Sequence, residues 1–95
     1  MITEIAVLKI KKDSNSEFEE NFRIASSIIS KSKGYISHEI LKCIEANNQY
    51  ILIVKWETLK DHTIVFRESY EYQEWKKLLH HFYDPFPVVE HYEEI

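Results

Sequence analysis

The residues of this sequence best suited to acid–base chemistry are its histidines, and His62 is the most informative of them. His62 stands between Leu59 and Phe66, at the i, i+3 and i+7 spacing that places side chains on one face of a helix. A helix face turned toward a sheet usually carries Leu or Phe. A neutral imidazole there can act as a general base near pH 7, because the ordinary pKa of histidine is about 6.5. The sequence predicts His62 as a catalytic base, with a buried histidine bonded to a backbone carbonyl as the alternative.

Two further histidines lie on predicted strands. His38 is in phase with Ile36 and Ile40, and His91 is in phase with Val89. Both can face the space between a sheet and its helices, where they would bind substrate, or equally an interface between subunits. Three histidines meeting in one pocket could hold a metal, but their spacing forms no ligand motif, and we predict no metal site.

Aromatic residues are 14% of the chain and gather in its second half. Tyr72 and Trp75 lie three residues apart on a predicted helix, and with Phe66 they can line a pocket for a flat apolar ligand or form ordinary core. Arg67 can hold an anionic substrate through a forked contact, or it can pair with Glu71 one helical turn further on. We therefore predict Phe66, Arg67, Tyr72 and Trp75 as substrate-binding residues.

The elements that must position these side chains follow from hydrophobic periodicity. Strands are predicted at 2–11, 35–44, 50–56 and 88–93, and helices at about 16–31, 59–67 and 70–81. The only glycine, Gly34, is expected to cap the end of the first helix. The order β-α-β-β-α-β, with the second helix split, predicts an α+β ferredoxin-like fold, in which an antiparallel four-stranded sheet carries its helices on one face.

Composition limits the classes of protein. With 95 residues, the chain is expected to be a single domain spanning 1–95. Its net charge of −4 argues against nucleic-acid and membrane-surface partners. The single Cys43 fits a reducing compartment, no signal peptide is visible, and no apolar run approaches the ~20 residues of a membrane span, so we expect a cytoplasmic protein. One glycine leaves no phosphate-binding loop.

The predicted third strand is apolar on both faces. One side carries Tyr50, Leu52, Val54 and Trp56, and the other carries Ile51 and Ile53. A sheet with one wet face should alternate apolar and polar residues, and helices can cover only one face. The sequence therefore predicts a homodimer that covers the second face, with a monomer that exposes a few aliphatic side chains as the alternative.

Three segments resemble the antibiotic biosynthesis monooxygenase (ABM) family. They are GYISHEI at 34–40, VKWETLKDHTIVFRES at 54–69 and EYQEWKKLLHHFYDPFPVVEHY at 71–92. The resemblance covers about Ile2 to Tyr92, and its most specific part is a strand ending in Trp-Glu followed by a helix with His-Thr-x-x-x-Phe-Arg-x-Ser. It implies a dimeric α/β barrel. Members of the family include cofactor-free oxygenases of quinols and polycyclic aromatics, and haem-degrading enzymes.

The haem-degrading branch is not expected here. Its members use an Asn on the first strand, a Trp on the helix after the third strand and a His further along. The first strand of this chain has no asparagine, and the other two positions fall near Val65 and Lys76. Trp56 belongs to the strand end and does not replace the missing helix residue.

The resemblance implies a monooxygenase that uses no cofactor and acts on a small aromatic or quinol-like compound. In that chemistry a base removes a proton, the anion passes an electron to dioxygen, and the protein shields the radical pair from water. The alternative is a non-catalytic dimer of the same fold that binds a small hydrophobic ligand. A hydrolase is not favoured, because no Gly-x-Ser-x-Gly or other nucleophile motif is present.

Overall fold

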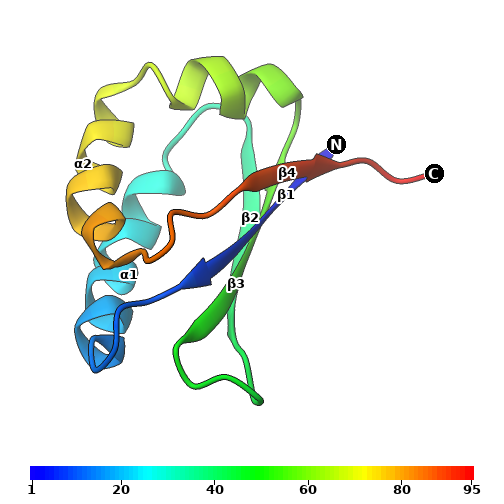
Figure 1. The fold of residues 1–95 in the computed structure, drawn as a ribbon. Helices are drawn as coiled ribbons and strands as arrows, with labels where there is room; N and C mark the ends of the chain where they lie inside the picture. The colour runs from blue at the N-terminus through cyan, green and yellow to red at the C-terminus, as the bar shows by residue number, and fades with distance from the viewer.

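The computed structural model describes all 95 residues and shows an open four-stranded antiparallel sheet with its helices on one face (Figure 1). The strands are β1 (Ile2–Lys9), β2 (Tyr35–Lys42), β3 (Gln49–Trp56) and β4 (Val89–Tyr92), in the spatial order β2-β3-β1-β4. The helical elements are α1 (Asn15–Ile29), the π-helix η1 (Asp61–Phe66), α2 (Tyr70–Leu79) and the 3-10 turn η2 (His80–Phe82). The predicted ferredoxin-like α+β order is confirmed.

Helix α1 packs an apolar stripe against the sheet. Its buried residues are Phe18, Phe22, Ala25 and Ile29, as their spacing predicts, whereas Ile28 is only partly buried. The helix ends at Ile29, so the prediction that Gly34 caps it is wrong. Gly34 instead has a φ of +80° in the turn that leads into β2, a backbone conformation that glycine adopts without steric cost.

The segment between β3 and α2 differs from its prediction. The predicted helix does begin at Leu59, but only Leu59 and Lys60 are α-helical, and Asp61–Phe66 form a π-helix. Its buried residues are Asp61, His62 and Phe66, while Leu59 is 45% exposed. The expected apolar stripe is therefore wrong at Leu59, which stays exposed although it is helical. Single π-helical turns occur often at functional sites.

Helix α2 begins where the sequence predicts a break. The Ser69 side chain accepts a hydrogen bond from the Tyr72 backbone N–H at 3.2 Å, which satisfies one of the free donors at the helix start. The helix buries Trp75 and Leu79 toward the sheet and lies beside α1 (Figure 1). A bond from Asn21 Nδ2 to the Leu78 carbonyl, 3.0 Å long, joins the two helices.

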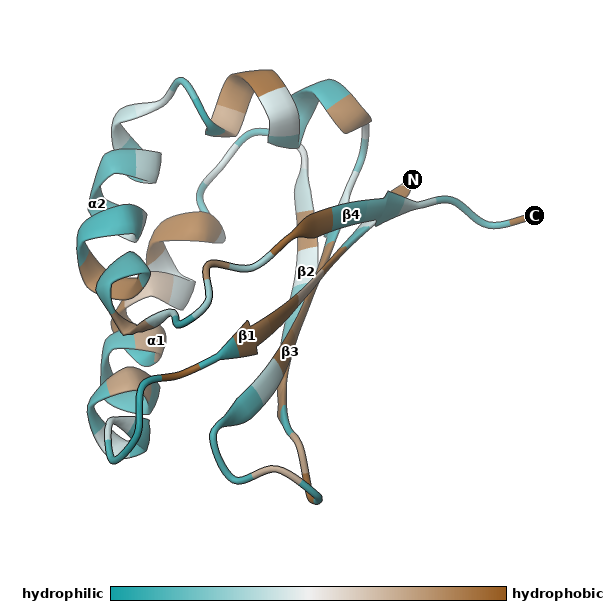
Figure 2. Ribbon diagram, viewed as in Figure 1, coloured by the Kyte–Doolittle hydropathy of each residue, from teal (hydrophilic) through white to brown (hydrophobic).

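The two faces of the sheet have different surroundings. On the inner face, under the helices, the core consists of Ala6, Leu8, Tyr50, Leu52, Val54 and Trp56 together with side chains from α1, α2 and η2. On the outer face, Ile5, Ile51 and Ile53 are only partly buried, and Val7 and Leu41 are 43% and 47% exposed. Figure 2 shows hydrophobic residues along β1 and the helices on one side of the sheet only. None of the helices combines the length and apolar composition needed to cross a lipid bilayer.

Candidate functional site

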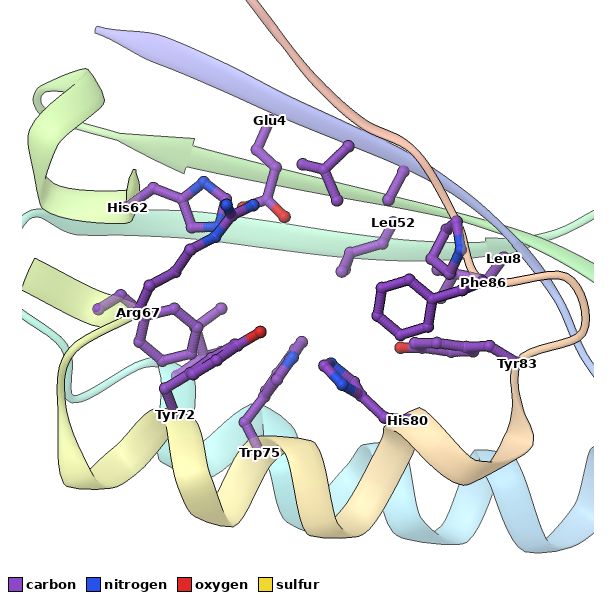
Figure 3. A pocket seen from close by; sticks show the side chains of 15 residues that line it. Glu4, Leu8, Leu52, His62, Arg67, Tyr72, Trp75, His80, Tyr83 and Phe86 are labelled. Carbon is purple, nitrogen blue, oxygen red and sulfur yellow. The ribbon is translucent and has the colours of Figure 1, made fainter. Parts of the chain in front are cut away.

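A cavity of about 360 Å³ lies between the inner face of the sheet and α2 (Figure 3). Its volume falls within the roughly 300–1,000 Å³ typical of small-molecule sites. Strands β1 and β3 form one wall, α2 forms the opposite wall, and the segment after η2 borders the open side with Phe86, whose side chain is 61% exposed. The lining is mostly hydrophobic, so the few polar groups in it stand out.

Glu4 is the one carboxyl group in this lining. It points inward because the alternation of β1 places it on the same face as Ala6 and Leu8, and it is 5% exposed. Its Oε1 accepts a hydrogen bond from Trp56 Nε1 at 2.9 Å. Burial raises the pKa of Glu4 to about 7, against smaller opposing effects of the Trp56 bond and the Arg67 charge. Glu4 can therefore exchange a proton near neutral pH.

His62 faces Glu4 from η1. Its Nε2 lies 3.4 Å from Glu4 Oε1, and its ring stacks on Trp56 with centroids 5.3 Å apart. Burial, and then the charges of Arg67 and His91, lower the pKa of His62 to about 3. The imidazole is thus neutral at ordinary pH, and its contact with Glu4 is a polar contact rather than an ion pair.

His91 reaches the same place from the edge strand β4. The register of β1 and β4 places His91 directly opposite Glu4. Its Nε2 lies 2.7 Å from His62 Nδ1, so one of these two nitrogens carries the shared proton. Burial, followed by the charge of Arg67, lowers the pKa of His91 as well.

Phe66, Tyr72 and Trp75 form the aromatic part of the cavity wall. The Phe66 ring meets Tyr72 and Trp75 edge-on, with centroids 5.3 Å and 6.0 Å away. Edge-to-face pairs are a favoured aromatic geometry and hold each ring in place. All three rings line the cavity, and they offer flat apolar surfaces to a ligand.

Arg67 follows η1, and its side chain extends along the cavity toward His62 and Glu4 (Figure 3). None of the ion pairs in the structure includes Arg67, so the predicted alternative of a pair with Glu71 is wrong. A guanidinium without a carboxylate partner can donate to an oxygen atom of a ligand.

The start of η1 is fixed by close packing between Gly34 and Asp61. The Asp61 Oδ2 accepts a bond from the Thr58 backbone N–H at 3.2 Å, and Thr58 Oγ1 accepts one from the Asp61 backbone N–H at the same distance. A Cβ atom on Gly34 would lie only 2.1 Å from Asp61 Oδ2. This turn therefore needs glycine opposite Asp61, and it sets the position of the next residue, His62.

Residues 1–78 match the family described as Antibiotic biosynthesis monooxygenase, ABM. The chain belongs to the antibiotic biosynthesis monooxygenase family. The resemblance proposed from the sequence is confirmed.

Relatives of this ABM protein extend the match over its whole length. The protein named "Uncharacterized protein YczJ" from Bacillus subtilis (strain 168) is 56% identical over 95 residues, which is all of both chains. A crystal structure from Bordetella bronchiseptica that carries the same family name has a TM-score of 0.94 and 31% identity, and the match covers 99% of this chain and 96% of that one. SnoaB from Streptomyces nogalater, described as a cofactor-independent oxygenase, has a TM-score of 0.85 and 14% identity over 99% of this chain and 92% of its own, a likeness of fold alone.

The ABM cavity gathers most of the residues predicted from the sequence. Its lining includes His62, Phe66, Arg67, Tyr72 and Trp75. His91 is outside the lining but contacts His62 from behind. No group of three or more His, Cys, Asp or Glu side chains is placed to hold a metal ion. The roles predicted for these residues remain predictions.

His38 lies apart from the cavity of the ABM protein. It projects from β2 toward α1, where its ring meets Phe22 edge-on at 5.9 Å. Its Nδ1 lies 2.5 Å from the Tyr35 hydroxyl. The three histidines considered together in the sequence therefore do not converge, because β2 and β4 are the opposite edges of the sheet.

Sequence reasoning did not single out Glu4, although a signal was present. Glu4 has the same phase as Ala6, Leu8 and Ile10 in the predicted strand 2–11, so alternation alone places a carboxyl group on an otherwise apolar face. Other lining residues that the prediction omitted are His80, Tyr83 and Phe86. They come from the segment after α2, whose path no periodicity describes.

Proposed function

We propose that this ABM protein is a monooxygenase that needs no bound cofactor and acts on a small aromatic compound of phenol or quinol type. The observation that carries the proposal is the cavity of about 360 Å³, which aromatic rings line together with the buried carboxyl group of Glu4 and the buried imidazole of His62. Membership of the ABM family supports the reaction class, and so does the fold shared with SnoaB, a cofactor-independent oxygenase.

The proposed reaction begins when the pair formed by Glu4 and His62 removes a proton from a phenol O–H or an activated ring CH₂. The substrate anion gives an electron to dioxygen, and the resulting radicals combine through a new C–O bond to give a peroxide. When a proton returns to the peroxide, the O–O bond breaks. For a ring CH₂, one oxygen atom remains as a carbonyl and the other leaves as water with both substrate hydrogens. Dioxygen is the only oxidant.

Each part of the cavity has a task in this reaction. The rings of Phe66, Tyr72 and Trp75 hold a flat substrate and exclude water from the radical pair. Arg67, which has no carboxylate partner, stabilises the negative charge that develops on the substrate oxygen. The carboxyl–imidazole pair of Glu4 and His62 accepts the proton that the substrate loses.

The test is oxygen uptake with a panel of quinols and anthrones, in protein freed of metals and flavins by dialysis against a chelator. We expect substrate-dependent uptake and one ¹⁸O atom from ¹⁸O₂ in the product. His62→Gln changes the cavity, and His38→Gln is the matched control outside it. We expect the first substitution to lower the rate at least about tenfold and the second to leave it unchanged. No uptake with any member of the panel would overturn the proposal.

A second candidate function is binding of a small hydrophobic ligand without catalysis. The observation that favours it is that both ring nitrogens of His62 are already engaged, Nε2 with Glu4 Oε1 at 3.4 Å and Nδ1 with His91 Nε2 at 2.7 Å, which leaves this imidazole no free nitrogen to act as a base on a ligand. Saturable binding of aromatic compounds with no oxygen consumption would support this function and exclude the oxygenase.

We also propose that the working unit is a dimer in which two copies of this chain join their outer sheet faces. The register of the sheet places Val7 beside Ile51, and Ile51 beside Leu41, in one continuous apolar row. Burying each such side chain stabilises an assembly by roughly 1.5–3 kcal/mol. Charges of both signs, Lys55 and Glu39, flank the aliphatic rows and can pair between copies.

A further inference from the structure

Three titratable side chains from three different elements form a row beside the cavity. Glu4 comes from β1, His62 from η1 and His91 from β4. Glu4 Oε1 faces His62 Nε2 at 3.4 Å, and His62 Nδ1 meets His91 Nε2 at 2.7 Å. Both ring nitrogens of His62 are therefore engaged within the row. Neither is left to take a proton from a ligand in the cavity.

The carboxyl group of Glu4 is in a different position. Both of its polar contacts, with Trp56 Nε1 and His62 Nε2, go to Oε1. Its Oε2 has no partner within the chain, and the carboxyl group points toward the cavity (Figure 3). An oxygen that is free of protein contacts and lies in a mostly apolar cavity is the natural acceptor for the O–H of a ligand.

The electrostatics agree with this geometry. Burial raises the pKa of Glu4 to about 7 and lowers that of His62 to about 3, so Glu4 is the member of the pair that gains and loses a proton near neutral pH. Arg67 acts in the opposite direction to burial and favours the ionised carboxylate. The titratable and charged groups that face Glu4 or share the cavity with it are His62, Arg67, His91, Tyr72, Tyr83 and, from η2, His80.

We propose that Glu4 is the catalytic residue that takes the proton of the substrate, and that His62 is a positioning residue that acts through Glu4. The proposal rests on the proposed oxygenase function but concerns only its first step. The O–H bond of a phenol breaks, the proton goes to Glu4 Oε2, and the electron pair stays on the phenolate oxygen, next to the Arg67 guanidinium. This step is a proton transfer and needs no oxidant.

Proton transfer can be observed without oxygenation. A nitrophenol, whose phenolate form is yellow, is added without dioxygen to the whole protein in weak buffer at about pH 8, where Glu4 is ionised. Two negative charges cannot share the cavity cheaply, so wild-type protein should take up about one proton for each phenolate that binds. A pH indicator measures that uptake, and the yellow absorbance shows that the proton is on the protein rather than on the ligand.

Variants assign the proton to a residue. Glu4→Gln keeps an oxygen atom that can accept the Trp56 bond, and it should bind the nitrophenol with almost no proton uptake. Glu57→Gln is the matched control on an exposed residue and should behave as wild type. His62→Gln should retain the uptake but shift its pH midpoint, an effect that a merely structural residue would not have.

Several outcomes would overturn the proposal. One is that Glu4→Gln takes up as many protons as wild type, and another is that His62→Gln loses proton uptake as completely as Glu4→Gln. The other two are that the nitrophenol bound to wild type is colourless, and that wild type does not bind nitrophenol at all. If Glu4→Gln does not fold, Glu4→Asp replaces it. The shorter carboxyl group should still take up the proton but should slow oxygenation at least about tenfold.

Oxygen uptake separates this proposal from the proposed function. Turnover that falls about a hundredfold or more in Glu4→Gln, with loss of a wild-type pH profile whose midpoint lies near 7, supports both. Proton uptake without oxygen consumption would support Glu4 as the proton acceptor and contradict the proposed oxygenase function. Oxygen consumption that is unchanged in Glu4→Gln would support the oxygenase function and contradict the catalytic role of Glu4.

Discussion

Each face of strand β1 includes residues that its surroundings do not favour. On the face covered by helices, Glu4 lies among core side chains at 5% exposure. On the uncovered face, Ile5 is only partly buried and Val7 is 43% exposed. The strand thus places a carboxyl group where water is scarce and aliphatic groups where the chain provides no cover.

Both departures have a free-energy cost for a single chain. Because the pKa of Glu4 is raised from 4.5 to about 7, ionised Glu4 lowers the free energy of unfolding by about 3 kcal/mol once the pH exceeds 7. Exposed aliphatic side chains forgo their burial energy. The cost of burying Glu4 is explained if Glu4 accepts a proton from the substrate. The cost of exposing aliphatic side chains disappears if a second copy of the chain covers the outer face. The comparison can therefore be tested separately on each face.

The largest effect is expected on the outer face. Ile51→Asp places a charge in the middle of the proposed interface, and it should raise the dissociation constant of the dimer about a thousandfold, or about 4 kcal/mol. Ile24→Asp makes the same change on α1, where Ile24 is already 49% exposed, and it should leave the assembly intact. Sedimentation equilibrium measures both. A monomeric wild type at micromolar concentration would contradict the dimer.

The next effect concerns the inner face. Because the pKa of Glu4 is higher in the folded state, its stabilising contribution is complete below about pH 4.5 and is lost as the pH rises toward 7. The stability of Glu4→Gln relative to wild type should therefore increase by about 3 kcal/mol between those pH values and then stay level. Urea unfolding of both proteins at one concentration measures this difference. A difference that does not change with pH would show that Glu4 is not perturbed.

A smaller effect is expected at the turn that positions η1. Gly34→Ala forces a Cβ against Asp61 and requires a positive φ from alanine, and it should cost about 2 kcal/mol. Ser32→Ala is the control in the same turn. The Ser32 hydroxyl is buried without a partner, so its removal should be neutral or stabilising. Thermal unfolding of the two variants compares them, and equal effects would refute the role of the Gly34 contact.

The smallest change in stability is expected at the open side of the cavity. Phe86 is 61% exposed, so Phe86→Ala should cost less than about 1 kcal/mol. It should nevertheless speed the dissociation of an aromatic ligand, because the ring borders the cavity. Phe82→Ala, at a position only 3% exposed, is the contrasting control and should cost about 3 kcal/mol or more. Stopped-flow ligand release and thermal unfolding give the two readouts.

The order and type of the main elements could be predicted from the sequence because their patterns are local. Strand β3 alternates between buried and half-buried residues along its whole length, and α1 shows the helical spacing of Phe18, Phe22 and Ala25. The π-helical form of η1 could not be predicted, since the spacing of His62 and Phe66 suits an α-helix equally well, and the close packing of Asp61 against Gly34 joins distant parts of the chain.

The site was predictable only in part, for a related reason. His62 and its aromatic neighbours attract attention by residue type and helical spacing. Glu4 looks like an ordinary surface residue until the phase of its strand is followed. His91 becomes its neighbour only through the pairing of β1 with β4, and that pairing joins the two ends of the chain. Contacts of such long sequence separation leave no local pattern.

The π-helical turn also constrains how the length of this segment can change during evolution. A π turn holds one more residue than an α turn. Deleting a single residue within Asp61–Phe66 would allow an ordinary α-helix to form with little loss of backbone bonding. Every side chain after the deletion would then rotate by about 100° around the helix axis relative to His62. Phe66 and Arg67 would leave the cavity together, so the spacing between the imidazole and the guanidinium depends on that one additional residue.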